Sequence, residues 1–489
     1  MKNVNEERNY KMNFSNGFLK YNNRDIQLKI AKIYLLFLPL RMPSIFSFLQ
    51  SIFGSTANNF VFILHFLGLF FIFYASKGII KVKDDEISKL LYLFGGIVLW
   101  YSFSSLVMSV YIQSRYGSIG NDTSYAAVLR SINFFVHYFM IFFYNKRLFE
   151  FLKKEIIIKI LDKLLVFLFI LGYLQIGVLN FGGIFTEIYN RVNIFNFLTE
   201  PFNTGMVTLT GSEGASAGTI IGVFVFPLLF SKLLVKKKNF KNIIIILLWL
   251  PILYFTSSAT AYILALSSLI GFVYFYFKNM KKDKNLRTRI VSIILSFTTI
   301  LILGISLYFI LPEESRQEIN YLTFEKVSDR DNGSTVSRTV PLVVNWRVFM
   351  RYPIIGIGNG NQGYYYEEFF PYWAENAVGS DVHIFLERSR NVIMNGALFF
   401  PSILSGYGIV GVSLLVGYFF KSEAIVKKNK ADLKDFYYIY KIALIPILLT
   451  GFQTLFSGDY LILFILSIPY MSKSITINGG GEVERTLTD

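Results

Sequence analysis

Two arginines in this chain have the spacing of an anion-binding site. Arg347 and Arg351 are four residues apart, so on a helix they lie on one face, one turn from each other. Guanidinium groups form planar, bidentate hydrogen bonds to phosphate and carboxylate, which an ammonium group cannot imitate. The pattern over 339–351 predicts an amphipathic surface helix, and Arg338 comes just before it. We expect these three arginines to bind a diphosphate.

A ring-rich segment follows, and it combines residue types that bind sugars with residue types that accept protons. Tyr365, Tyr366 and Trp373 lie within this segment. Aromatic faces with a polar edge suit the ring of a sugar, although the same side chains are common at any membrane interface. Glu367 lies between them, and His383 is the one histidine expected outside the membrane. Because a carboxylate or an imidazole can accept a proton from a hydroxyl, both are candidate general bases.

The elements that must position these residues are apolar segments long enough to span a membrane. The chain is 53% hydrophobic and 18% aromatic, with a mean hydropathy of +0.48, which is incompatible with the polar surface of a soluble domain. Crossing about 30 Å of hydrocarbon takes ~20 helical residues. The sequence therefore predicts an all-α polytopic membrane protein with about twelve transmembrane helices. They lie near 31–52, 60–80, 88–112, 124–145, 156–180, 216–235, 242–257, 259–278, 289–311, 396–420, 436–454 and 457–472.

The distribution of lysine predicts how these helices are oriented. The chain contains 31 lysines and 17 arginines, and the lysines concentrate in every second loop. Because basic residues in short loops stay in the cytoplasm, both termini are expected there. The loops on the opposite side carry one clear lysine, Lys326, against nine arginines. The ligand is therefore expected to be anionic and extracytoplasmic.

One long loop, 312–395, separates the ninth predicted span from the tenth. It is far longer than a typical connection, and loops of this length usually carry function, here expected on short helices. The other parts are a cytoplasmic segment 1–30, the spans within 31–311 and 396–472, and a disordered tail 473–489. The arginines of the loop can also pair with its own eleven carboxylates and simply hold it folded.

Charged side chains also occur in or beside the predicted spans, where each costs about 2.5–3.5 kcal/mol. Arg130 lies near the outer end of the fourth span, and Arg191 lies in the loop before the sixth. Glu213 belongs to a run of small residues, 210–218, that leads into the sixth span. Small residues allow close packing and non-helical backbone at membrane depth beside protein or water. We expect Glu213 to face a wet cavity, and Arg130 either to line a cavity or to reach the headgroups.

Several other features exclude classes of function. The net charge of +16 is explained by lysines beside helix ends, near anionic headgroups, so no nucleic-acid partner is predicted. The absence of cysteine excludes disulfides and thiolate metal sites. No metal or other cofactor is predicted, and His65 and His137 lie in spans, where we interpret them as making structural hydrogen bonds. The glycine turn 356–360 matches a nucleotide-binding motif only weakly, because no strand and helix surround it.

Four segments stand in an order typical of one family. They are 212–216, 254–262, 347–360 and 402–411. Together with the predicted spans and the one long, late loop, they resemble the bacterial O-antigen polymerase and ligase superfamily. Gly214 replaces a proline of the family pattern, and Ala397 stands where the ligase branch has a histidine. The resemblance therefore favours a polymerase over a ligase.

The resemblance implies glycosyl transfer at the outer face of the bacterial cytoplasmic membrane, between glycans carried on polyprenyl diphosphate. It also implies a fold like that of the GT-C glycosyltransferases. The residues expected to stabilise the leaving diphosphate are Arg338, Arg347, Arg351, Arg191 and Arg130. The candidate bases are Glu213, Glu367 and His383, and the candidate sugar-binding residues are Tyr365, Tyr366 and Trp373.

The expected partners are lipid-linked glycans, membrane lipids, and a flippase and a chain-length regulator, and neither a metal nor a nucleotide sugar is required. Two alternatives stay open. One is an O-antigen ligase-type transferase. The other is a lipid-linked oligosaccharide flippase or another transporter, although such proteins typically show related halves and this chain shows no internal repeat.

Overall fold

The structure is a computed structural model of the whole chain. It describes residues 24–46, 48–49, 53, 57, 59–76, 86–116, 124–193, 198, 201–211, 214–235, 240–280, 313, 316–317, 333–358, 361–375, 399–450 and 460–472. Throughout these residues the regular structure is helical, and the only β-structure among them is an isolated bridge between Arg41 and Asn59. The predicted all-α class is confirmed for this part of the chain. The predicted ninth span, 289–311, and the tail 473–489 lie outside it.

Five helices in the described part are long and apolar enough to cross a membrane. They are α4 (Glu86–Tyr116), α6 (Lys154–Phe181), the continuous run of α9 (Gly214–Thr219), η3 (Ile220–Val225) and α10 (Phe226–Val235), α12 (Ala259–Met280) and α20 (Phe399–Lys428). Five further helices coincide with predicted spans: α3 (Val61–Ala75), α5 (Ser124–Phe151), α11 (Phe240–Tyr254), α22 (Asp435–Thr450) and α24 (Tyr460–Leu466). The protein is thus a helical membrane protein, and the number of twelve spans stays a prediction.

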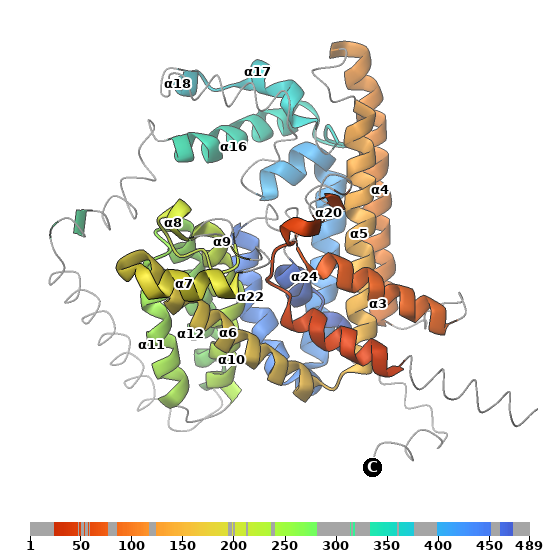
Figure 1. The fold of residues 1–489 in the computed structure, drawn as a ribbon. Coiled ribbons are helices and arrows are strands. Elements are labelled where there is room, and N and C mark those ends of the chain that lie inside the picture. Colours follow the sequence, from red (N-terminus) through yellow and green to blue (C-terminus); the bar gives the residue numbers. More distant parts are fainter. Residues whose placement is uncertain are drawn as a thin grey trace, which may run out of the picture.

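The apolar helices fall into enclosed and outward-facing groups. Every residue of α24 is buried, and so is every residue of the π-helical turn η3. In contrast, α4 and α5 lie side by side along one flank of the molecule (Figure 1), and α4 exposes Leu99 and Phe103. A helix that is apolar all round must be enclosed by other helices or lie in lipid. The exposed side chains of α4 therefore fit a surface in contact with hydrocarbon.

The small-residue run that opens the sixth predicted span allows close packing against α12. Gly218 and Gly222 are four residues apart and face α12. A Cβ on Gly222 would lie 2.6 Å from the Cβ of Leu264, and one on Gly218 would overlap Ala261. Small residues at this spacing let two helix backbones approach in a membrane, where packing rather than water exclusion drives association.

The first predicted span, 31–52, is not one continuous helix in the structure. The helix of 24–36 ends in a turn before the bridge between Arg41 and Asn59. The Asn59 amide donates a hydrogen bond to the carbonyl of Leu38 at 2.8 Å and accepts one from the backbone of Val61 at 3.0 Å. These bonds satisfy backbone groups that the helix end leaves free, so the chain can turn there instead of continuing.

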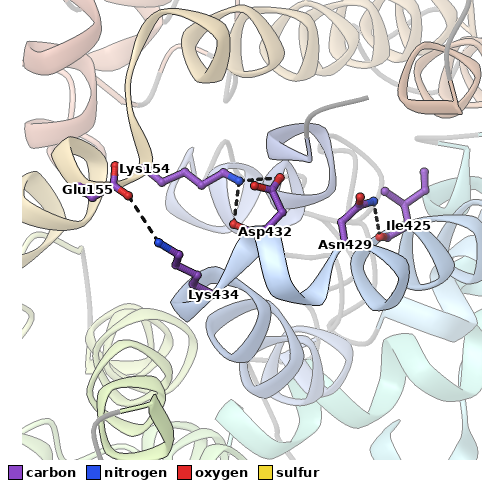
Figure 2. A network of polar contacts seen from close by, with 6 residues as sticks. All are labelled: Lys154, Glu155, Ile425, Asn429, Asp432 and Lys434. Carbon is purple, nitrogen blue, oxygen red and sulfur yellow. Dashed lines mark hydrogen bonds and ion pairs between the residues drawn. The ribbon is translucent and has the colours of Figure 1, made fainter. Parts of the chain in front are cut away.

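Charged side chains join the end of α20 to the start of α6 (Figure 2). The Lys154 ammonium binds both the side-chain carboxylate and the backbone carbonyl of Asp432, each at 2.8 Å. Asp432 lies on the short helix α21 (Lys430–Leu433), and Lys434 after it pairs with Glu155 at 3.9 Å. The Asn429 amide donates to the carbonyl of Ile425 at 2.9 Å and so caps the end of α20. These residues lie in segments where the sequence predicts cytoplasmic helix ends.

The segment that follows residue 332 docks on the membrane helices as a small helical layer (Figure 1). It consists of α16 (Gly333–Arg351), η5 (Gln362–Tyr365), α17 (Tyr366–Phe369) and α18 (Tyr372–Glu375). The predicted helix 339–351 is the larger part of α16, but it does not simply lie on the surface. Val340, Val344 and Val348 are fully buried, and they pack with Met108 and Ile112 of α4. This apolar stripe, one residue per turn, fixes which face of α16 remains outside.

Candidate functional site

The two central arginines of the predicted anion site lie together at the end of α16. Arg347 donates a hydrogen bond from Nη1 to the carbonyl of Phe369 at 3.0 Å. Arg351 forms an ion pair with Glu368, and its guanidinium lies 5.7 Å from the ring centres of both Tyr352 and Phe369. Both arginines therefore reach the same short helix, α17. We refer to Arg347, Arg351, Glu368 and the rings of Tyr352 and Phe369 as the arginine cluster.

Glu368 is the main influence on the electrostatics of the central guanidinium, that of Arg351. Glu368 raises the pKa of Arg351 above its ordinary value, chiefly by accepting its hydrogen bond. Partial burial and the nearby positive charge of Arg115 act in the opposite direction. An arginine guanidinium is a cation at every physiological pH in any case. Glu368 is the described carboxylate that pairs with it, and both side chains are about one-third exposed, so solvent can reach the pair.

The arginine cluster depends on a short stretch of backbone that connects α16 to a break in α20. The nitrogens of Ile357 and Gly358 donate to the carbonyls of Ser405 and Gly406, each at 2.7 Å, and the nitrogen of Ile409 donates to the carbonyl of Pro353 at 2.8 Å. This set of three backbone hydrogen bonds is the docking seam. It pairs two of the four segments that carry the family resemblance, which are about fifty residues apart in sequence.

Side chains from α4 complete the docking seam. Ser104 donates from Oγ to the carbonyl of Ile355 at 2.7 Å, and the Trp100 indole donates to the carbonyl of Tyr407 at 3.2 Å. The ring of Tyr101 stacks on that of Tyr407 with 3.6 Å between the ring centres. A broken helix leaves carbonyl groups without partners inside the protein, and the Trp100 indole satisfies that of Tyr407. Ser104 binds the facing stretch that follows α16. The α4 helix is therefore part of the platform on which the arginine cluster stands.

The other two segments of the resemblance also lie against each other. The nitrogen of Val207 donates to the carbonyl of Phe255 at 2.8 Å, and a Cβ on Gly214 would overlap the carbonyl of Thr256. Leu209 and Ser257 have positive φ angles of 51° and 47°. Such backbone strain costs about 1–3 kcal/mol per residue and persists only where surrounding contacts impose it.

Gln175 of α6 supplies those contacts. Its side chain is fully buried, accepts hydrogen bonds from the nitrogens of Thr208 and Leu209 at 3.2 and 2.8 Å, and donates to the carbonyl of Leu209 at 2.9 Å. One amide thus holds both polar groups of a strained residue. The sequence analysis did not identify Gln175 as important. The available signal was a glutamine within a predicted span, because such a side chain needs polar partners.

The predicted ligands outside the arginine cluster are placed less completely. Arg191 lies on α7 (Gly183–Val192), is exposed, and pairs with Glu187 one turn earlier at 2.5 Å. A carboxylate of its own helix thus pairs with Arg191. Arg130 lies on α5 and Arg338 on α16, and the structure describes the backbone but not the side chain of either residue. Their roles stay predictions.

The aromatic residues divide in the same way. Tyr365 is fully buried between the rings of Tyr352 and Phe369, so its ring packs on protein rather than on an open face. Trp373 is half-buried on α18. Tyr366 lies on α17, and the structure describes its backbone but not its side chain. Sugar binding by these three rings stays a prediction.

The candidate bases are largely outside the described residues. Glu213 and His383 both lie there, and Glu367 is placed on α17 by its backbone alone. The histidines interpreted as structural do make buried hydrogen bonds, because the Tyr460 hydroxyl lies 2.8 Å from Nε2 of His137 and 3.4 Å from Nδ1 of His65. Among the described residues, no group of three or more histidines, cysteines or acids has the arrangement of a metal site.

Fold and site together define a helical membrane protein in which a docked helical layer carries an arginine cluster. The chain matches no family model, and no curated protein matches its sequence. The resemblance to the O-antigen polymerase and ligase superfamily therefore rests on the four sequence segments alone.

Proposed function

We propose that the protein is a glycosyltransferase that polymerises polyprenyl-diphosphate-linked oligosaccharide units at the outer face of a bacterial cytoplasmic membrane. The observation that carries the proposal is the arginine cluster, where Arg347 and Arg351 converge with aromatic rings beside a membrane helix. A lipid-linked diphosphate presents its charge at the depth where such a helix leaves the hydrocarbon. Arginine is suited to this ligand because two of its N–H groups can bind two phosphate oxygens at once.

The reaction needs little chemistry from the protein. A hydroxyl oxygen of the acceptor glycan attacks the anomeric carbon of the donor, and the bond from that carbon to the diphosphate oxygen breaks with its electron pair leaving on the diphosphate. The hydroxyl proton passes to a base, for which Glu213, Glu367 and His383 are the candidates. Arg347 and Arg351 stabilise the charge that grows on the diphosphate, and removing one such donor typically costs about 10²–10³ in rate.

The pairing of the resemblance segments supports the same proposal. The segments 353–358 and 405–409 form the docking seam, and Val207 and Gly214 lie against Phe255 and Thr256. Segments that serve one reaction have to converge in space although they are far apart in sequence. The first pair positions the arginine cluster, and the second pair positions the strained turn that precedes Glu213.

Reconstitution of the purified protein tests the proposal. Liposomes with a short glycan on polyprenyl diphosphate, without added metal, should yield a ladder of products that differ by one repeat unit. Absence of elongation with the correct repeat unit would contradict the proposed polymerase. Transfer of an intact glycan to a second lipid, without a ladder, would identify the ligase-type alternative instead.

A substitution that keeps the positive charge but removes the bidentate guanidinium group tests the role of Arg351. Arg351→Lys should lower polymerisation at least tenfold while expression persists, because an ammonium group cannot form the bidentate contact. The matched control is Arg147→Lys, since Arg147 also pairs with a glutamate, Glu150 at 2.7 Å, but lies on α5. Equal activity of Arg351→Lys and the control would remove Arg351 from the site.

A further inference from the structure

The end of the membrane helix α4 reaches the arginine cluster. The α4 helix has 31 residues, which corresponds to about 46 Å at 1.5 Å per residue and exceeds the ~30 Å of hydrocarbon it would cross. Its last turns therefore extend past the membrane core, next to α16. Tyr111 and Arg115 occupy these turns, and Arg115 donates from Nη1 to the Tyr111 hydroxyl at 3.2 Å.

These α4 side chains adjoin the arginine cluster. The ring centre of Tyr111 lies 6.3 Å from that of Tyr352 in an edge-to-face arrangement. The Arg351 guanidinium lies 5.7 Å from the centre of the same Tyr352 ring. The charge of Arg115 is close enough to act on Arg351 directly. Tyr352 is thus the common neighbour that joins the α4 residues to the arginine cluster.

This enlarged group brings guanidinium groups of two separate elements together. Arg115 belongs to α4, Arg347 and Arg351 belong to α16, and Glu368 pairs with Arg351. An anion that lies between guanidinium groups is attracted by each of them. A diphosphate has enough oxygens to bind both elements at once, and Tyr111 limits the freedom of Arg115 before the ligand arrives.

We propose that Arg115 is a further diphosphate-binding residue, so that the anion is held between the membrane helix α4 and the docked helix α16. The inference rests on the proposed function for the identity of the ligand, a diphosphate carried by an isoprenoid lipid. It adds that the site is shared by two elements, so binding the ligand also strengthens docking of the α16 layer. Sequence reasoning did not single out Arg115, although its place at the end of a predicted span was the available signal.

Direct binding to the full-length protein in detergent micelles tests the inference without any turnover. The probes are farnesyl diphosphate, inorganic pyrophosphate and farnesol, titrated into wild type and into the variants Arg115→Gln, Arg115→Lys and Arg147→Gln. Arg115→Gln should weaken farnesyl diphosphate binding tenfold or more and leave farnesol binding unchanged. Arg115→Lys should give an intermediate loss because it keeps the charge and loses the fork. The control Arg147→Gln should bind as wild type.

Three outcomes would overturn the inference. The first is unchanged farnesyl diphosphate affinity in Arg115→Gln, and the second is an equal loss of affinity in the control. The third is pyrophosphate that binds as tightly as farnesyl diphosphate, because the ligand would then not be lipid-borne. Melting temperatures of the variants show whether each is folded, and Arg115→Lys retains the test if the glutamine variant is not.

This experiment separates the inference from the proposed function. Wild type that binds the lipid diphosphate through Arg115 and yet never elongates a glycan would contradict the polymerase but support the site. A protein that forms ladders while Arg115→Gln binds normally would support the polymerase and contradict the role of Arg115.

Discussion

Substitution of Gly408 by alanine should undock the α16 layer. Gly408 interrupts α20 with φ 63° and ψ −169°, a backbone conformation that is essentially restricted to glycine. A Cβ at this position would overlap the carbonyl oxygen of Ile354 and lie 2.7 Å from the nitrogen of Ile355. Both of these atoms belong to the stretch that forms the docking seam. The change therefore acts on the contact that holds the arginine cluster in place.

The expected cost follows from two terms. Forcing alanine into this backbone conformation costs about 1–3 kcal/mol. Overpacking a tightly packed contact costs about 1–3 kcal/mol more, because the two backbones have to separate. The sum is about 2–6 kcal/mol, which corresponds to at least a ~30-fold shift toward the undocked state, at 1.4 kcal/mol per tenfold. The three seam hydrogen bonds at 2.7–2.8 Å would lengthen or break with that movement.

Limited proteolysis of the protein in liposomes measures the undocking. Cleavage within 333–375 should be at least tenfold faster for Gly408→Ala than for wild type, and polymerisation should fall with it. The matched control is Gly417→Ala on the same helix, where an added Cβ would meet nothing within 4 Å. In that control the substitution should be neutral or stabilise the helix by about 0.5–1 kcal/mol.

Cleavage of Gly408→Ala at the rate of wild type and of Gly417→Ala would contradict the predicted undocking. In that case the break in α20 accepts a side chain, and the seam is not the element that holds the layer.

The remaining predictions concern three other contacts. Gln175→Ala should lower the free energy of unfolding by about 1–3 kcal/mol, because it leaves buried backbone groups of the strained turn without partners. The control is Asn180→Ala, on the exposed side of the same helix, which should change the melting temperature little. Tyr460→Phe should also lower the free energy of unfolding by about 1–3 kcal/mol, since both buried histidines lose the hydroxyl between them. A melting temperature equal to that of Tyr372→Phe, the control at an exposed position, would contradict this prediction. Asp432→Asn should lower the free energy of unfolding by less than about 1 kcal/mol, because partly exposed ion pairs are weak and the bond from Lys154 to the backbone carbonyl of residue 432 remains. A larger loss of stability, or a loss that salt does not change, would contradict the interpretation of the pair in Figure 2 as a surface contact.

Long apolar segments were predictable because the requirement that shapes them is local. The span predicted at 156–180 is α6, Lys154–Phe181, and the span predicted at 259–278 is α12, Ala259–Met280. A helix in hydrocarbon has to satisfy all its backbone groups internally and present apolar side chains throughout, and both conditions are visible in a single stretch of sequence. At 31–52 the helix ends early because Pro39 and Pro43 cannot donate helical hydrogen bonds, and the Asn59 side chain binds the carbonyl of Leu38. The prolines are visible in the stretch itself, whereas the contact of Asn59 comes from outside it.

The arginine pair was partly predictable for a similar reason. Helical spacing placed Arg347 and Arg351 on one face, and in the structure both reach α17. Their partner Glu368 was not predictable, because its approach depends on a turn and on the docking of α17. The burial of Tyr365 has the same origin, since the ring-rich segment folds back on α16 instead of presenting every ring to a ligand.

The sequence by itself determined that the chain is helical, apolar enough for a membrane, and supplied with paired arginines on a helix face, because periodicity and hydropathy act over one or two turns. Only the tertiary structure decided that the four resemblance segments meet in two pairs, that Gln175 holds the strained turn, and that Arg115 stands beside Arg351. Those contacts join residues 33 or more positions apart, for example Gln175 with Thr208. They depend on glycine conformations and helix breaks whose directions no local pattern specifies, so they exist only once the helices are packed.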